Sequence, residues 1–101
     1  MDSIITTNEG ICAISGRRAT AKHHVVFGIG KRQLAEEDGL WIPINDEVHN
    51  MGKFAIHGNP TAEKLSKMLG QLAFEKHWVA KGDTEDEARE RFRKRYGRSY
   101  L

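Results

Sequence analysis

The chain has 101 residues, of which 39% are hydrophobic and 30% are charged, and its formal net charge is +2. This length suits one compact domain with a small core. No apolar run approaches the roughly 18 residues of a membrane-spanning helix, and the N-terminal residues lack the basic and apolar regions of a secretory signal. We therefore expect a single cytoplasmic domain, residues 1–101, that does not bind membranes.

Four segments in the first half have the apolar and β-branched residues, bounded by turn residues, that are typical of strands. They are residues 4–7, 11–14, 23–27 and 40–44. Asn8-Glu9-Gly10 is a turn signal and predicts that the first two strands form an N-terminal hairpin. Gly28 opens a stretch that we expect to be a loop as far as Gly39. Asn45 can cap a short helix that begins at Asp46 and carries His49 in its first turn.

The second half predicts two helices, of which the first is long and amphipathic. Asn59 can cap it, Pro60 suits its first position, and Gly82 ends it. Apolar residues recur along it at helical spacing, which favours packing against the core. These residues are Leu65, Met68, Leu69, Leu72 and Ala73, with Trp78 further on.

The last helix begins at a Thr84–Glu87 capping box and ends at Gly97. The final 14 residues contain six basic side chains and one acidic side chain, Glu90. The basic residues are Arg89, Arg91, Arg93, Lys94, Arg95 and Arg98. A segment of this charge either contacts a polyanion or is a solvated helix face.

Two adjacent histidines, His23 and His24, stand where a strand is expected, and His49 and His57 follow downstream. A strand, loop, strand and short helix bring His23 and His24 near His49, because a hairpin returns the chain to a neighbouring position. Imidazoles ligate divalent transition metals, and a neutral histidine can also act as a general base. Adjacent strand side chains point to opposite faces, so both histidines serve one site only if the strand ends or bends there.

The order of these features resembles the HNH family of nucleases, which have the ββα-metal or His-Me finger fold. Small phage and prophage members combine a double histidine with segments like GKRQLAEEDGLWIPI, NDEVHN, IHGNP and FRKRYGRSYL. The resemblance covers residues 12–101. It implies an α+β domain with a ββα-metal core at about residues 20–58, an N-terminal hairpin, and two C-terminal helices at about residues 60–97.

This resemblance implies a metal-dependent endonuclease, either a nickase or a double-strand nuclease, that hydrolyses phosphodiester bonds of DNA, with RNA as the alternative substrate. His24 would be the general base, and His23 and His49 would bind one divalent ion, which could be Mn²⁺, Ni²⁺, Zn²⁺ or Mg²⁺. His57 would be a third ligand or a phosphate contact; it could equally be a loop residue that makes one backbone hydrogen bond. The residues expected at the nucleic-acid backbone are Lys31, Arg32, Arg91, Arg93, Lys94 and Arg95.

Three points set the chain against the family pattern. His49 and His57 are eight residues apart, which is more than two helical turns, so both can bind one ion only if the helix ends between them, as Gly52 would permit.

The other two points are missing residues. Many members hold a structural zinc with two CxxC pairs, but only Cys12 is present here; Ser15, Asn45 and Val48 occupy the other positions, so we expect no zinc knuckle. The middle Asn is absent between residues 25 and 44, and Asp38 could brace the loop instead. The alternative function is therefore a catalytically inactive protein of this fold that binds nucleic acid or a host protein.

Overall fold

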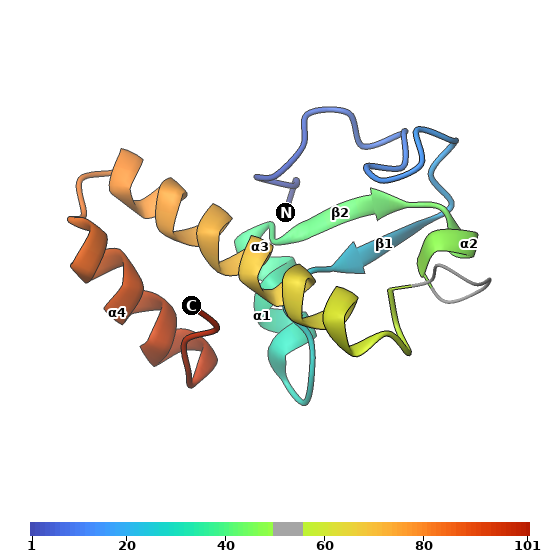
Figure 1. The fold of residues 1–101 in the computed structure, drawn as a ribbon. Helices are drawn as coiled ribbons and strands as arrows, with labels where there is room; N and C mark the ends of the chain where they lie inside the picture. The colour runs from blue at the N-terminus through green and yellow to red at the C-terminus, as the bar shows by residue number, and fades with distance from the viewer. Residues whose placement is uncertain (50–55) are drawn as a thin grey trace.

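The computed structural model describes residues 1–49 and 56–101. In this part of the chain the elements follow the order β1 (Ala21–His24), α1 (Lys31–Asp38), β2 (Trp41–Ile44), α2 (Asp46–His49), α3 (Pro60–Ala80) and α4 (Glu85–Tyr96). Figure 1 shows α3 and α4 as a helical hairpin, and α3 contacts Val25 and Val26, which follow β1. The α+β class expected from the sequence is confirmed.

The two strands pair antiparallel, in a register that places Ala21 opposite Ile44 and His24 opposite Trp41. One more backbone hydrogen bond, from Val25 N to the carbonyl of Leu40 (3.0 Å), extends the pair beyond β1. Every residue of β2 is buried. The two predicted strands therefore exist, although β1 begins and ends earlier than the expected residues 23–27.

The predicted N-terminal hairpin is wrong. Residues 4–7 and 11–14 form no strand, and Ile11 makes only an isolated bridge with Arg18. The backbone of this segment bonds to distant residues instead: the amide of Ile4 donates to the carbonyl of Gly39 (2.9 Å). Ser3 Oγ likewise donates to the carbonyl of Trp41 (2.6 Å). Docking against the β2 region has replaced local strand pairing.

The predicted loop at residues 28–39 is also wrong, because most of it is the helix α1. Gly30 precedes the helix at φ 75°, and Gly39 follows it at φ 70°, in the left-handed region that glycine adopts without strain. The amide of Gly39 bonds to carbonyls of the last turn. Gln, Leu, Ala and Glu are good helix formers, so the two glycines delimit a helix.

The boundaries predicted for the short and the two long helices are largely confirmed. Asn45 Oδ1 accepts from the amide of Glu47 (3.1 Å), and Asn59 Oδ1 accepts from that of Ala62 (3.1 Å). Thr84 forms the capping box of α4, which ends at Gly97. These short polar side chains satisfy amides that have no partner inside their helices.

Helix α4 packs on α3 through aromatic rings and on α1 through one carboxylate. The rings of Phe74 and Phe92 lie 5.3 Å apart, and those of Phe92 and Tyr96 are stacked at 4.6 Å. Asp38 accepts from Arg95 Nε (2.6 Å) and Tyr96 Oη (2.7 Å). Asp38 therefore ties α1 to α4 and does not brace a loop as the sequence suggested.

Half of the apolar stripe predicted to face the core is exposed, although Ala73 and Trp78 do pack against the core. Leu65, Leu69 and Leu72 are 58%, 41% and 53% exposed. The buried residues of α3 are Ser66, Gly70, Gln71 and Phe74. A Cβ at Gly70 would lie 2.5 Å from Val26 Cγ2 and 2.9 Å from Val25 Cγ2, so only glycine permits this approach. The helix thus packs its small and polar face against the residues that follow β1.

None of the helices in residues 1–49 and 56–101 combines the length and the apolar character needed to cross a membrane.

Candidate metal centre

Three of the four predicted histidines meet at one point of the fold. His23 lies on β1, His49 ends α2, and His57 precedes α3. Their ring centroids are 4.9 Å (His23 to His49), 5.1 Å (His23 to His57) and 4.8 Å (His49 to His57) apart. Each offers one nitrogen within 4.8 Å of the other two. The amide of His57 also donates to the carbonyl of His49 (3.2 Å), which holds these two residues together. Gly52, expected to end the helix between them, lies outside the described residues.

A serine on α3 determines which nitrogen of His23 carries the proton. Ser66 Oγ donates its single hydrogen to the carbonyl of Val25 (2.9 Å). The contact of 2.7 Å between His23 Nε2 and Ser66 Oγ must then be donated by the imidazole. The lone pair therefore lies on Nδ1, which is buried and has no hydrogen-bond partner among residues 1–49 and 56–101. A buried, unpartnered nitrogen is costly in an apolar site and suits a metal ligand.

Glu63, one turn before Ser66 on α3, engages a second histidine. His57 Nδ1 lies 3.3 Å from Glu63 Oε2. A carboxylate in this place holds a proton on Nδ1 and leaves the lone pair on Nε2, the arrangement common behind metal-ligating histidines. The Phe27 ring packs against His57 with its centroid 4.8 Å away and limits the rotation of the imidazole.

The environment of His23 and His49 favours their neutral forms. Burial, and then the charges of His49 and His57, lower the pKa of His23 to about 3. Burial also lowers the pKa of His49, followed by the charges of His57 and Arg32. Because a histidine must be neutral to ligate, His23 and His49 are ready to bind a cation at neutral pH. Arg32 is within electrostatic reach of both.

The structure does not bring His24 into this ring cluster. Its Nε2 lies 2.9 Å from Glu36 Oε1 on α1, on the other side of β1 from His23. The hydrogen bond from His24, and further ones from Lys22 and the N-terminal amine, lower the pKa of Glu36 to about 2. The ionised carboxylate holds a proton on His24 Nε2, which leaves the lone pair on Nδ1.

Three of the four positions discussed above for a zinc knuckle, Cys12, Ser15 and Asn45, lie close together and offer one sulfur. Burial raises the pKa of the Cys12 thiol, but hydrogen bonds from Ser15 and from the backbone of Asn45 and Ile14 lower it to about 7. The amide of Ser15 donates to Cys12 Sγ (3.3 Å). Among the described residues, the group able to hold a metal is the three histidines.

The predicted basic residues of α4 are largely engaged within the protein. Arg91 makes two hydrogen bonds to Asp83 (2.9 and 3.0 Å), and its guanidinium lies 3.9 Å from the centre of the Trp78 ring. Arg95 binds Asp38, as described above, and Arg93 lies 3.7 Å from Glu90. Lys94 makes no ion pair within residues 1–49 and 56–101. Intramolecular partners therefore compensate much of the charge expected to meet nucleic acid.

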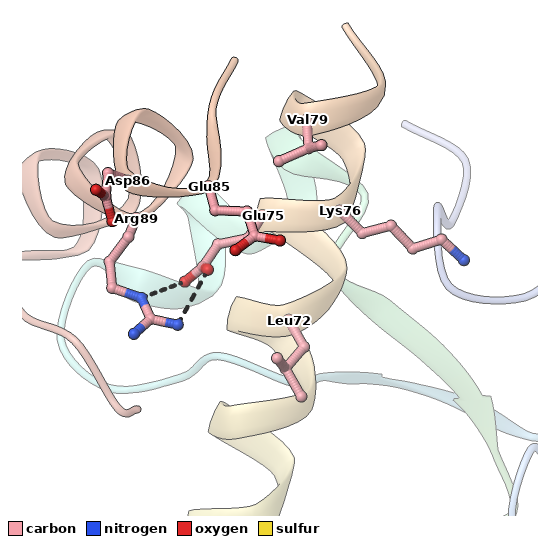
Figure 2. A pocket seen from close by; sticks show the side chains of 7 residues that line it. All are labelled: Leu72, Glu75, Lys76, Val79, Glu85, Asp86 and Arg89. Carbon is pink, nitrogen blue, oxygen red and sulfur yellow. Dashed lines mark hydrogen bonds and ion pairs between the residues drawn. The ribbon is translucent and has the colours of Figure 1, made fainter. Parts of the chain in front are cut away.

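A pocket between α3 and α4 lies apart from the histidines. Figure 2 shows Leu72 and Val79 beside the ion pair of Arg89 and Glu75, whose atoms lie 3.1 and 3.2 Å apart. None of the three histidines lines it. The pocket is therefore separate from the metal centre.

Sequence reasoning missed the residues that support the site, namely Phe27, Glu63 and Ser66. A signal was present, because Glu63 and Ser66 are three residues apart and share one face of the predicted helix. A serine on a helical face that otherwise contacts the core indicates a buried polar partner.

We expect Ser66→Ala to weaken metal binding by about 10- to 100-fold, because the His23 ring loses the partner that fixes its proton and orientation. Calorimetric titration with Zn²⁺ measures this, with the exposed Ser15→Ala as the matched control. Unchanged affinity in a folded Ser66→Ala protein would show that Ser66 does not orient the ligand.

Comparisons of this chain with protein-family models, with curated proteins and with solved structures found no match.

Proposed function

We propose that this protein is a metal-dependent endonuclease of the HNH type, in which His23, His49 and His57 hold one divalent ion. The observation that carries the proposal is the buried, unpartnered Nδ1 of His23, which lies in a cluster with two further imidazoles. The fixed tautomer of His23 and the carboxylate behind His57 are the features expected of ligating histidines.

The topology supports the same proposal. Strands β1 and β2 pair antiparallel, and α2 follows β2 directly and carries His49. This order is compatible with the proposed ββα-metal core, in which α1 would be an insertion between the strands. His23 and His49 come from the first strand and the helix, the two elements from which the family's ligands would come.

The chain's residues would divide the work of phosphodiester hydrolysis. The three histidines hold the ion, which when bound supplies a Lewis acid for the scissile phosphate and for the charge on the leaving 3′ oxygen. His24 is the last residue of β1 and lies outside the imidazole cluster, but its charge acts on both His23 and His49. From the end of the strand its Nδ1 would accept the proton of the attacking water, while Glu36 holds its Nε2. Arg32, whose charge acts on both His23 and His49, would bind a phosphate oxygen beside the centre, and the products would be a 3′ hydroxyl and a 5′ phosphate.

Incubation of the protein with supercoiled plasmid and Mg²⁺, Mn²⁺, Ni²⁺ or Zn²⁺ tests the proposal. We expect nicked or linear DNA with at least one ion and none with chelator or with His49→Ala. A protein that binds DNA and metal but does not cleave DNA with any of the four ions would be the inactive nucleic-acid-binding protein. One that has no affinity for DNA would instead fit a host-interaction protein.

We expect Mn²⁺, Ni²⁺ and Zn²⁺ to bind more tightly than Mg²⁺. The centre offers imidazole nitrogens, whereas Mg²⁺ prefers oxygen ligands and dehydrates reluctantly. Calorimetric titrations in one buffer give the order directly. Tighter binding of Mg²⁺ than of all three transition ions would contradict a centre built from these histidines.

A further inference from the structure

Three cationic side chains from separate elements surround one aromatic ring near the C-terminus. Lys31 Nζ donates to Tyr100 Oη (3.0 Å) and lies 5.6 Å from the ring centre. Lys67 Nζ of α3 lies 5.7 Å from the same centre, and Arg98 Cζ lies 4.7 Å from it. We call Lys31, Lys67, Arg98 and Tyr100 the Tyr100 patch.

The segment that carries Tyr100 is held in place by a buried glutamine of α3. Gln71 Oε1 accepts from the amide of Tyr100 (2.6 Å), and its Nε2 donates to Ser99 Oγ (2.9 Å). The Tyr100 ring also lies 6.1 Å from that of Phe92, in the core. The position of the Tyr100 ring is therefore fixed by contacts with α3 and α4.

The positive charges of the patch have no compensating carboxylate. Among the described residues, no ion pair involves Lys31, Lys67 or Arg98, whereas Arg91 and Arg95 of α4 are paired with aspartates. An aromatic face attracts a cation but leaves its charge in place. Three such cations around one ring repel one another, and a polyanion would relieve that repulsion.

The patch adjoins the metal centre through a single ring. Lys67 Nζ lies 4.6 Å from the centre of the Phe27 ring, and that ring packs on His57 at 4.8 Å. A phosphate bound at Lys67 would thus be one ring away from the histidines.

We propose that the Tyr100 patch binds backbone phosphates of the DNA next to the phosphate held at the metal centre. The proposal rests on the proposed function. DNA fits better than an acidic protein surface because its charges repeat at regular intervals along a strand, so one strand reaches both the centre and the patch. Contacts of this kind position a substrate and do not read its sequence.

The test compares two double variants that remove the same charge. Lys31→Gln with Lys67→Gln removes two patch lysines. Lys76→Gln with Lys81→Gln removes one lysine from the last turns of α3 and one that follows the helix directly. Binding of a fluorescent DNA duplex to the metal-free protein is measured by anisotropy at several salt concentrations. We expect the patch variant to bind DNA roughly 10- to 100-fold more weakly. The slope of log affinity against log salt concentration should become shallower by about 1.8, since each phosphate contact contributes about 0.9.

The control variant should keep nearly the parent's affinity and salt slope, and Lys31→Arg with Lys67→Arg should keep both because the charge remains. Equal losses in the two neutral variants would overturn the patch and indicate a nonspecific effect of net charge. Parental binding by the patch variant would overturn it too, as would a parent that binds an acidic protein but no DNA.

The two proposals can fail separately. If the parent binds DNA through the patch but does not cleave it with any metal ion tested, the nuclease function is wrong and the patch stands. If the patch variant binds and cleaves like the parent, the patch is wrong and the nuclease stands. Calorimetry with Zn²⁺ should give the same metal affinity for the parent and the patch variant.

Discussion

His24→Ala should slow single-turnover DNA cleavage by about two to four orders of magnitude, the usual effect of removing a general acid or base. Metal binding should persist, because His24 lies outside the cluster of His23, His49 and His57. His23→Ala should instead weaken metal binding, and a high metal concentration should restore part of its activity. Cleavage rates and metal affinities of both variants, at several metal concentrations, separate the two roles.

His77→Ala is the matched histidine control. His77 lies on α3, half-buried against Trp78 with the ring centroids 5.6 Å apart, and belongs to neither site. Its removal should leave cleavage and metal binding unchanged. Full activity of His24→Ala would contradict the mechanism, whereas interchanged behaviour of the His23 and His24 variants would keep the nuclease and exchange their roles.

Phe92→Ala should lower the free energy of unfolding by about 3–5 kcal/mol, the usual cost of emptying a buried aromatic site. Phe92 is fully buried and packs against Phe74, Tyr96 and Tyr100. It therefore joins α3, α4 and the C-terminal segment. Urea unfolding followed by circular dichroism measures the change, provided that the m-value stays that of the parent.

Leu72→Ala is the control for this prediction. Leu72 belongs to the apolar stripe that the sequence placed in the core, but it is largely exposed. Its removal should change the free energy of unfolding by no more than about 0.5 kcal/mol. A loss as large as that of Phe92→Ala would show that the stripe is buried in solution.

Helix ends were predictable because they depend on a few neighbouring residues. Asn59 accepts from the third residue after it, and Thr84 exchanges hydrogen bonds with Glu87. Such contacts form within one turn of chain and need no distant partner. The sequence for this reason located α3 and α4 to within a residue or two.

The N-terminal segment and the buried face of α3 could not be predicted, because distant residues decide them. The alternating apolar residues near Ile4 suggest a hairpin, but the Ile4 amide bonds to Gly39, far along the chain. The leucines of α3 have the spacing of a core stripe, yet Gly70 permits the closest approach to Val25 and Val26. The spacing of apolar residues identifies an amphipathic helix, but it does not say which part of the protein packs against each of its faces.

The three clustered histidines of the candidate site could be predicted from the sequence, but the residues that support them could not. The spacing of His23, His49 and His57 permitted a cluster, and the structure forms one. The pairing of His24 with Glu36 could not be foreseen while residues 28–39 were expected to be a loop, since only the helix α1 places that carboxylate beside β1.

Crystals of the protein soaked in Zn²⁺ or Mn²⁺ test the central claim most directly, through an anomalous difference map at the absorption edge of the metal. We predict one strong peak among the three imidazoles, at about 2.0–2.1 Å from His23 Nδ1 and from one nitrogen each of His49 and His57 for zinc. The peak should be absent from His49→Ala crystals soaked in the same way. A map with no peak at these histidines, or with its strongest peak on other residues, would contradict the account.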